Sequence, residues 1–331
     1  MPHVIINGKL LRPPLNRDFF HVADRFAESQ ENDAIAGRLK RVRKVFHDEF
    51  PTRGLWPLPM ETAFSLLYVS KDFPEIYAPQ TGRRRTAGTR QEIQDFLRLT
   101  FGILTAVEAH APAENPYSRL VSALGPRDTI VTLNYDTILD KALVKAGWSD
   151  PHFGYDLLGS ANKVRWHMKR PACTSRLDKV RLLKLHGSLN WYIGGSFNRI
   201  GKVFDAKPTK VMMSEQPRTN ELSGHIRQIV PPIYGKFFNN PHWRRLWKRA
   251  YEALVRADCI VVVGCSLSST DFHLSGMLSH AVIKRKSVGR KFRRAILVDR
   301  VSTRRRWEDV LKGCVSEKVV FATFEQFASH L

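Results

Sequence analysis

The chain has few cysteines, and none of them is spaced as a zinc knuckle requires. The four cysteines are Cys173, Cys259, Cys265 and Cys314, and no two of them are separated by only two residues. The sequence therefore encodes neither a disulfide-rich scaffold nor a zinc site built from close ligand pairs. Cys259 and Cys265 flank an apolar run, which predicts that both thiols are buried.

A membrane-spanning run is also lacking. No uninterrupted apolar stretch approaches the roughly 20 residues that a transmembrane helix needs. Residues 1–6 lack the charged start and the apolar stretch of a signal peptide. We therefore expect a cytoplasmic protein with no membrane partner.

Basic residues, in contrast, are in large excess. The chain has 53 Lys and Arg against 31 Asp and Glu, a formal net charge of +22. Much of the excess lies in short clusters, at 83–85, 244–249, 284–286, 290–294 and 304–306. Such a field attracts polyanions and is compatible with bound nucleic acid, although a solvated basic surface explains it equally well.

The apolar residues predict an α/β fold. The 331 residues are 43% hydrophobic, enough for a substantial core. Five segments rich in β-branched residues predict strands, at 129–133, 182–185, 259–263, 295–298 and 319–322. Their continuous hydrophobicity is typical of a parallel sheet covered on both faces. Helical patterns follow Asp136, Asn240 and Ser302, so we expect a Rossmann-like, doubly wound parallel sheet with helical insertions and no zinc ribbon.

We expect residues 1–331 to form a single domain. Its Rossmann-like core would comprise approximately residues 1–20 and 125–331, with a helical insertion at approximately 21–124. The clearest helical periodicity in that insertion lies at 91–110. The stretches 149–180 and 194–230 are polar and turn-rich, which predicts irregular insertions at the sheet edge.

Three of the predicted strands end in residues that can bind a ligand or take part in a reaction. These residues are Asn134, Asp136, His186, Gly187, Gly264, Ser266 and, slightly later, Asp271. Ligands of open α/β sheets bind beyond the carboxyl ends of the strands, so the three motifs could line one crevice.

Structural roles fit the same residues. Asn134, Asp136 and Asp271 each precede a predicted helix and could cap it. A histidine after a strand can be a hydrogen-bonded structural side chain, and Gly264 with Ser266 can form an ordinary turn. Residue types alone leave both interpretations open.

Taken together and in order, the motifs resemble those of the Sir2 family. The resemblance rests on Asn-Tyr-Asp-Thr at 134–137, Lys-Leu-His-Gly-Ser-Leu-Asn-Trp at 184–191, and Gly-Cys-Ser-Leu at 264–267 followed by Asp271. The particular residues in these motifs resemble those of the zinc-free bacterial branch, many of whose members are NAD-consuming effectors in anti-phage defence. The matching positions run from about 129 to 301.

The resemblance implies a role for each residue. Asn134 would hold the ribose of NAD and orient a water molecule, and a neutral His186 would accept a proton. The residues expected to contact the NAD are Asp136, Gly264, Ser266 and Asp299, the last at the end of the strand at 295–298.

Two departures from the family pattern affect the expected activity. The cysteines cannot build the four-cysteine zinc ribbon of the protein deacylases, which disfavours deacylation and favours plain NAD cleavage. The family's glycine-rich phosphate loop near the N-terminus is not present, and only Gly8 remains before the prolines at 13–14. Either the start is truncated or the pocket is inactive.

We therefore expect an NAD glycohydrolase that releases nicotinamide and ADP-ribose, with NAD as its substrate and no zinc. A defence effector of this kind would be controlled by assembly, as a homo-oligomer, or by a partner. The alternative is a catalytically silent Sir2-like binding module whose basic surface holds nucleic acid or a partner protein. A third possibility, an NAD-dependent protein deacylase, is weakened by the missing zinc pattern.

Overall fold

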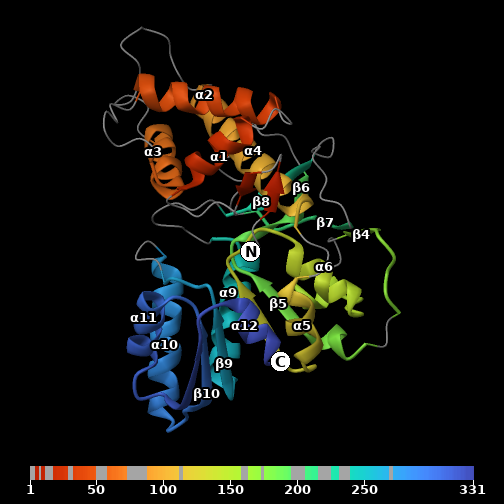
Figure 1. The fold of residues 1–331 in the computed structure, drawn as a ribbon, viewed down its shortest axis with the longest axis vertical. Coiled ribbons are helices and arrows are strands. Elements are labelled where there is room, and N and C mark those ends of the chain that lie inside the picture. The colour runs from red at the N-terminus through yellow and green to blue at the C-terminus, as the bar shows by residue number, and fades with distance from the viewer. Residues whose placement is uncertain are drawn as a thin grey trace.

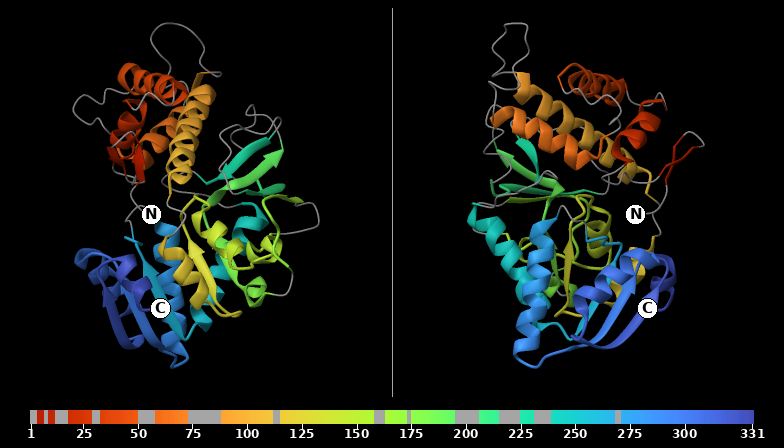
Figure 2. Two further views of the ribbon diagram at one scale, coloured as in Figure 1. Left: turned by 45° about the vertical axis from the view of Figure 1, so that its right-hand side comes forward. Right: turned by 90° about the vertical axis from the view of Figure 1, so that its left-hand side faces the viewer.

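The computed structural model describes most of the chain. The described residues are 4–6, 9–11, 18–28, 33–49, 58–72, 88–111, 115–157, 163–172, 175–194, 206–214, 225–230, 239–267 and 271–331. Gly8 and Cys173 lie outside them. Figure 1 shows a helical layer at one end, a small sheet beneath it, and a region of parallel strands and helices at the other end; both views of Figure 2 keep this order.

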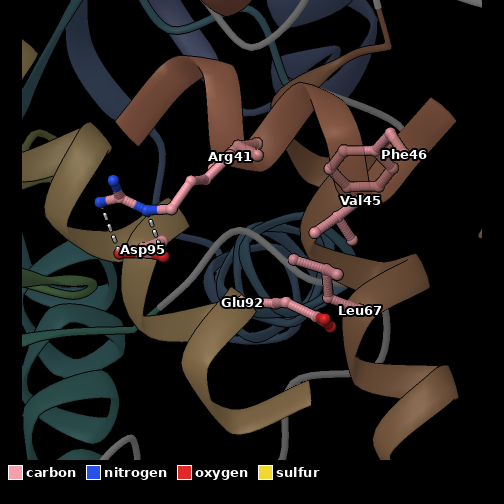
Figure 3. A pocket seen from close by; sticks show the side chains of 7 residues that line it. Arg41, Val45, Phe46, Leu67, Glu92 and Asp95 are labelled. Atoms are coloured by element: carbon pink, nitrogen blue, oxygen red, sulfur yellow. Dashed lines mark hydrogen bonds and ion pairs between the residues drawn. The ribbon is translucent and has the colours of Figure 1, made fainter. Parts of the chain in front are cut away.

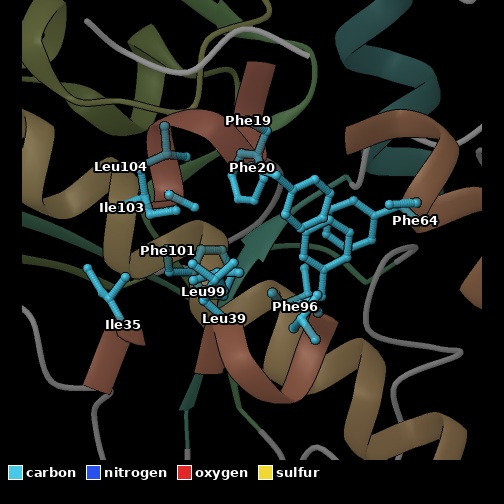
Figure 4. Packing of buried hydrophobic residues seen from close by; sticks show 14 of the residues in the cluster. Phe19, Phe20, Ile35, Leu39, Phe64, Phe96, Leu99, Phe101, Ile103 and Leu104 are labelled. Atoms are coloured by element: carbon cyan, nitrogen blue, oxygen red, sulfur yellow. The ribbon is translucent and has the colours of Figure 1, made fainter. Parts of the chain in front are cut away.

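The helical layer confirms the helices expected before residue 124. It consists of α1 (Phe19–Glu28), α2 (Asp33–Glu49), α3 (Met60–Asp72) and α4 (Gly88–Ala109). Phenylalanines fill its centre: the rings of Phe64 and Phe96 stack at 4.0 Å and those of Phe20 and Phe96 at 5.5 Å (Figure 4). Near the N-terminus, β1 (Val4–Ile6) and β2 (Lys9–Leu11) form an antiparallel hairpin.

All five predicted strands form, and they pair in parallel. One group is β3 (Thr129–Thr132) with β5 (Arg181–Lys184), and the other has the order β11 (Val315–Phe321), β10 (Phe292–Val298), β9 (Cys259–Val263). Among the described residues β3 and β9 do not pair with each other. A parallel α/β architecture is therefore confirmed, and a single doubly wound sheet stays a prediction.

Helices pack around these strands. They are α5 (Pro116–Ala123), α6 (Ile138–Lys145), α9 (Pro241–Arg256), α10 (Phe272–Ser287), α11 (Val301–Leu311) and α12 (Phe324–Ser329). Asn240 caps α9 by accepting a hydrogen bond from the backbone N–H of His242 at 2.9 Å. Leu274 of α10 and Trp307 of α11 belong to one core cluster with Ile260 and Val262 of β9.

The opposite face of β9 is open, which corrects one expectation from the sequence. Burial alternates along the strand, so Val261 and Val263 are exposed. Cys259 lies on the same face and is exposed, whereas Cys265 is half-buried. The prediction of a buried thiol at Cys259 was wrong because only one face of the strand is covered.

Three strands of a four-stranded sheet lie in the stretches 149–180 and 194–230, which were expected to be irregular. Its order is β4 (Lys163–His167), β7 (Lys210–Ser214), β6 (Gly187–Gly194), β8 (His225–Ile229), and α7 (Pro151–Gly154) precedes it. Leu189 and Ile229 pack into the helical layer, while Trp191 packs into the core around β5. This sheet therefore joins the helical layer to the parallel strands.

Among the described residues, no helix combines the length and apolar character needed to cross a bilayer.

Candidate active site

The carboxyl ends of β3 and β5 bring two predicted site residues together. Thr132 pairs with Lys184 in parallel register, so Asn134 and His186 each lie two residues beyond the last pair. A bond from Leu185 N to Thr132 O, 3.0 Å long, continues the ladder toward them. Asn134 is exposed and His186 is buried at 6% exposure. An exposed amide therefore follows one strand, and an enclosed imidazole follows the strand paired with it.

Gly187 lets the neighbouring sheet approach this imidazole. Its φ is +85°, and a Cβ atom there would lie 2.4 Å from the carbonyl oxygen of Gln228. The backbone N–H of Val230 donates to the carbonyl oxygen of His186 at 2.7 Å. Only glycine fits this position, because a side chain would meet backbone atoms rather than a movable side chain.

A carboxylate from the third motif reaches His186. Asp271 Oδ2 lies 3.6 Å from His186 Nε2, too long for a hydrogen bond and close enough to stabilise a proton on the imidazole. Asp271 precedes α10 but makes no side-chain cap to it, and its Oδ1 is buried with no hydrogen-bond partner among the described residues. The expected capping role is therefore absent, and the carboxylate faces the imidazole instead.

Aromatic rings and the same carboxylate surround His186. The rings of Tyr135 and Trp247 lie 6.3 and 6.2 Å from the imidazole. Burial, followed by the charge of Asp271, raises the pKa of Tyr135, so its hydroxyl stays protonated and donates to the carbonyl oxygen of Val230 at 2.9 Å. The described neighbours of the imidazole thus include two aromatic rings and the carboxylate of Asp271.

The carboxylate of Asp136 faces the interior of the protein. Its Oδ1 accepts from the backbone N–H of Ile138, the first residue of α6, at 3.1 Å, whereas the N-cap residue is Thr137. Burial raises its pKa to about 6, while the charge of Lys184 opposes this rise and that of Glu108 adds to it. Its Oδ2 is buried with no hydrogen-bond partner among the described residues. Ligand contact by Asp136 remains a prediction.

The turn after β9 is open. Gly264 has a φ of +61° with free space where a Cβ would lie, and Gly264 and Ser266 are both exposed. Consecutive residues of α11 hold the turn: Trp307 Nε1 donates to Cys265 O at 2.7 Å and Arg306 Nη1 to Ser266 O at 3.2 Å. The guanidinium of Arg306, which was not among the predicted site residues, thus lies beside the turn.

Asp299 follows β10 at the same edge. Val298 pairs with Val263, so Asp299 and Gly264 lie side by side at the strand ends. The carboxylate accepts from the backbone N–H of Arg300 at 2.6 Å. Burial, and after it the charges of Asp271 and Asp299, raise the pKa of Cys265, so both carboxylates act on the thiol in this turn. Asp271 thus links the two strand groups.

Two hollows lined by described residues lie away from these strand ends. One, of about 220 Å³, lies between α2, α3 and α4, where Arg41 bonds Asp95 through Nε at 3.0 Å and Nη2 at 3.2 Å (Figure 3). It is smaller than most ligand pockets. The other, of about 520 Å³, lies between α11 and β11. Neither is lined by a predicted site residue.

Within the described part of the chain, no three His, Cys, Asp or Glu side chains are grouped to hold a metal ion.

Comparison with known proteins identifies the family. The SIR2-like domain matches residues 128–312, just over half of the chain. This range begins immediately before β3 and ends after α11, so it contains every residue of the candidate site. No curated protein matches the chain. At the level of the family, the match indicates an NAD-related activity. The chain belongs to the SIR2-like family.

Proposed function

We propose that the chain is an NAD glycohydrolase that cleaves the bond between nicotinamide and ribose. The observation that carries this proposal is a buried imidazole, His186, facing a buried carboxylate, Asp271, at the strand ends where the register also places Asn134. In NAD the nicotinamide leaves as a neutral amide from a positively charged ring, so its departure needs no acid. The site must instead stabilise an oxocarbenium-like ribose and position water.

His186, Asp271 and Asn134 can each perform one part of this reaction. The carbon–nitrogen bond breaks with its electron pair on nicotinamide, and the oxygen of water bonds to the ribose carbon. His186 accepts the proton that this water loses and later returns it to solvent. Asp271 stabilises the imidazolium that forms, and the exposed amide of Asn134 holds the ribose and the water.

The remaining residues would bind the rest of the NAD molecule. The unpartnered Oδ1 of Asp271 suits a hydroxyl donor such as that of a ribose. Gly264 and Ser266 offer an exposed turn to the diphosphate, with the guanidinium of Arg306 as a counter-charge. Asp299 would accept from the adenosine ribose hydroxyls and Asp136 would be a further ribose contact.

The test is nicotinamide release and NAD loss by the purified protein. Asn134→Ala and His186→Ala should each lower turnover at least about 100-fold, the usual scale for a positioned catalytic group. Asn239→Ala and His280→Ala are matched controls, because both side chains are exposed and outside the site. Wild-type protein that neither turns over nor binds NAD would refute the proposal.

Control of turnover is part of the proposal, since unrestrained loss of NAD would kill the cell. A defence effector would be held inactive until it assembles or meets a partner. Repeating the assay over a range of protein concentrations, with and without nucleic acid, tests this. Turnover that is high and unchanged in every condition would contradict it.

One observation favours the binding module as a second candidate. Exposed cations gather at the amino ends of β9, β10 and β11, opposite the site: Arg256, Lys286, Arg290, Lys291, Arg293 and Lys312. The loops that carry them touch, since Arg290 Nη2 donates to Arg256 O at 3.3 Å and Phe292 N to Cys314 O at 2.8 Å. Among the described residues, the carboxylates that form ion pairs with these cations are Glu252, which pairs with Arg256, and Asp258, which pairs with Arg290.

Duplex DNA binding at several salt concentrations tests this second candidate. Lys286→Glu, Arg290→Glu and Lys291→Glu together should abolish binding and flatten its salt dependence. Arg119→Glu, Arg127→Glu and Lys145→Glu change the net charge equally at exposed positions elsewhere and should leave most binding intact. Equal loss in both triple variants would show attraction to the whole basic surface rather than to this cluster.

A further inference from the structure

A buried ion pair lies directly behind the loop that carries Asn134. Lys184 is the last residue of β5 and Asp140 lies in the first turn of α6; Lys184 Nζ is 3.0 Å from Asp140 Oδ2, and each side chain is 1% exposed. Removing two charges from water costs free energy that their attraction often fails to recover, and apolar residues of similar size can replace such pairs without loss of stability. Stability alone is therefore a poor explanation for this pair.

The lysine connects the pair to the backbone of the loop. Lys184 Nζ also donates a hydrogen bond to the carbonyl oxygen of Asp136. Lys184 also ends β5 two positions before His186. One side chain thus ties the strand that ends in His186 to the loop that carries Asn134.

The aspartate is anchored from the opposite direction. Asp140 accepts a hydrogen bond from the hydroxyl of Tyr155, which also accepts from Asn190 Nδ2 at 3.1 Å. The ring of Tyr155 is fully buried between Trp148 and Trp191, each 5.2 Å away. Neither charge can therefore shift without disturbing a packed aromatic cluster.

Other elements fix the rest of the loop, so the pair completes a set of contacts. Leu189 N donates to Tyr135 O at 2.8 Å, and Thr137 N donates to Glu108 Oε2 at 3.0 Å. Asp136 lies between these two residues, and the described bond to its carbonyl oxygen comes from Lys184. Without that bond, the middle of the loop loses its link to β5.

We propose that Lys184 and Asp140 are positioning residues that fix the backbone of residues 134–137 and so hold Asn134 in place relative to His186. They act through the carbonyl oxygen of Asp136 and do not contact the substrate. The catalytic consequence rests on the proposed NAD hydrolysis, whereas the fixing of the loop does not.

Hydrogen exchange of the whole protein, followed by mass spectrometry, tests the fixing of the loop. The double variant Lys184→Met/Asp140→Leu removes both members of the ion pair together, and the buried Asp136 can stay protonated once Lys184 is gone, so the melting temperature should change by only a few degrees. Exchange in peptides covering residues 133–140 should become about tenfold faster. Nicotinamide release should fall about tenfold in kcat with KM nearly unchanged, the pattern of an interaction needed in the transition state.

Arg285→Met is the matched control. Arg285 is also fully buried, and its guanidinium donates to Leu254 O at 3.1 Å and to Val255 O at 2.8 Å, at the far end of α9. Its loss should speed exchange around residues 250–258 and leave kcat of the folded protein unchanged. A general loosening of the core would instead speed exchange at 133–140 in both variants.

Unchanged exchange at 133–140 in the folded double variant would overturn the proposal. Should that variant fail to fold, Tyr155→Phe removes only the hydroxyl that anchors Asp140. A smaller, roughly threefold, increase in exchange at the same peptide is then expected, and no change would overturn the proposal. If the wild type hydrolyses no NAD, the proposed function fails while the exchange result still decides whether the pair fixes the loop.

Discussion

The two groups of strand ends that meet at Asp271 are built differently. After β3 and β5, His186 and Asp136 are buried, and contacts from α4, α6 and the four-stranded sheet hold the loop between them. After β9 and β10, Gly264 and Ser266 are exposed, and the described hydrogen bonds that hold the turn come from Arg306 and Trp307 of α11 and from Gly264 N to Val298 O. A reacting group benefits from a fixed position in a poorly hydrated site, whereas an exposed turn suffices to hold phosphate and ribose. The difference suggests that chemistry and binding occupy separate halves of the site.

The two halves should differ most in the stability that is lost when the glycine of each half is replaced by alanine. Gly187→Ala combines a positive φ with a Cβ only 2.4 Å from Gln228 O, so we expect a loss of about 4 kcal/mol or more and little folded protein. Gly264→Ala meets no atom within 4 Å, and only its positive φ should cost about 1–2 kcal/mol. Chemical denaturation measures both losses. Similar losses would show that the halves are equally tightly packed.

The same contrast explains what the sequence could predict. The continuous apolar runs of β3 and β9 predicted that these segments are strands. Asn240 followed by Pro241 predicted the start of α9. Each predicted site residue lies at a strand end for the same reason, since the motifs directly follow those runs.

Two strands of the four-stranded sheet, β6 and β8, were hard to predict because they carry buried polar residues. Ser188 and Asn190 in β6 and Gln228 in β8 are buried, and the pairing of these strands shifts register between Ser188 and Tyr192. In β6 and β8, apolar and polar residues therefore do not alternate regularly, and the usual signal of a strand is lost. Likewise, the contact of His186 with Asp271 joins residues far apart in sequence, and it depends on tertiary packing in which α10 contacts α9 and α9 contacts β5.

The pH dependence of stability should distinguish Asp136 from a surface carboxylate. Burial raises the pKa of Asp136 from 3.8 to about 6, so the folded state binds the proton more tightly than the unfolded state. Its stabilising contribution is therefore present below pH 3.8 and is lost as the pH rises through 6. Asp136→Asn should gain about 2–3 kcal/mol relative to the wild type between pH 4 and pH 7, measured by denaturation at each pH.

Asp156→Asn is a control because its effect on stability should change with pH in the opposite direction. Although burial favours the protonated form, bonds and charges from Arg245, Arg181 and Arg249 lower the pKa of Asp156 overall. Its stabilising contribution is present above the ordinary pKa and is lost as the pH falls. The variant should therefore be relatively less stable at pH 7 than at pH 4. The same trend in both variants would contradict the assignment of a raised pKa to Asp136.

Substitution of the linking carboxylate should affect chemistry more than binding. Asp271→Asn keeps the shape of the side chain but removes the charge that faces His186 Nε2, so kcat for nicotinamide release should fall about tenfold. A fall in kcat/KM caused only by a higher KM would instead assign Asp271 to binding.

The smallest effect is expected in the open half. Asp299→Asn should raise KM about threefold and leave kcat unchanged, because a half-buried carboxylate bonded to Arg300 N can contribute to binding without touching the reacting bond. A larger fall in kcat than for Asp271→Asn would reverse the division between the halves.

The most direct test of that division is NAD affinity and nicotinamide release measured on the same preparations of wild type, His186→Ala and Ser266→Ala. We predict that His186→Ala binds NAD within about threefold of wild type while turnover falls at least about 100-fold, and that Ser266→Ala weakens binding more than it slows turnover. Loss of NAD binding in His186→Ala to the same extent as turnover would contradict the separation of chemistry from binding.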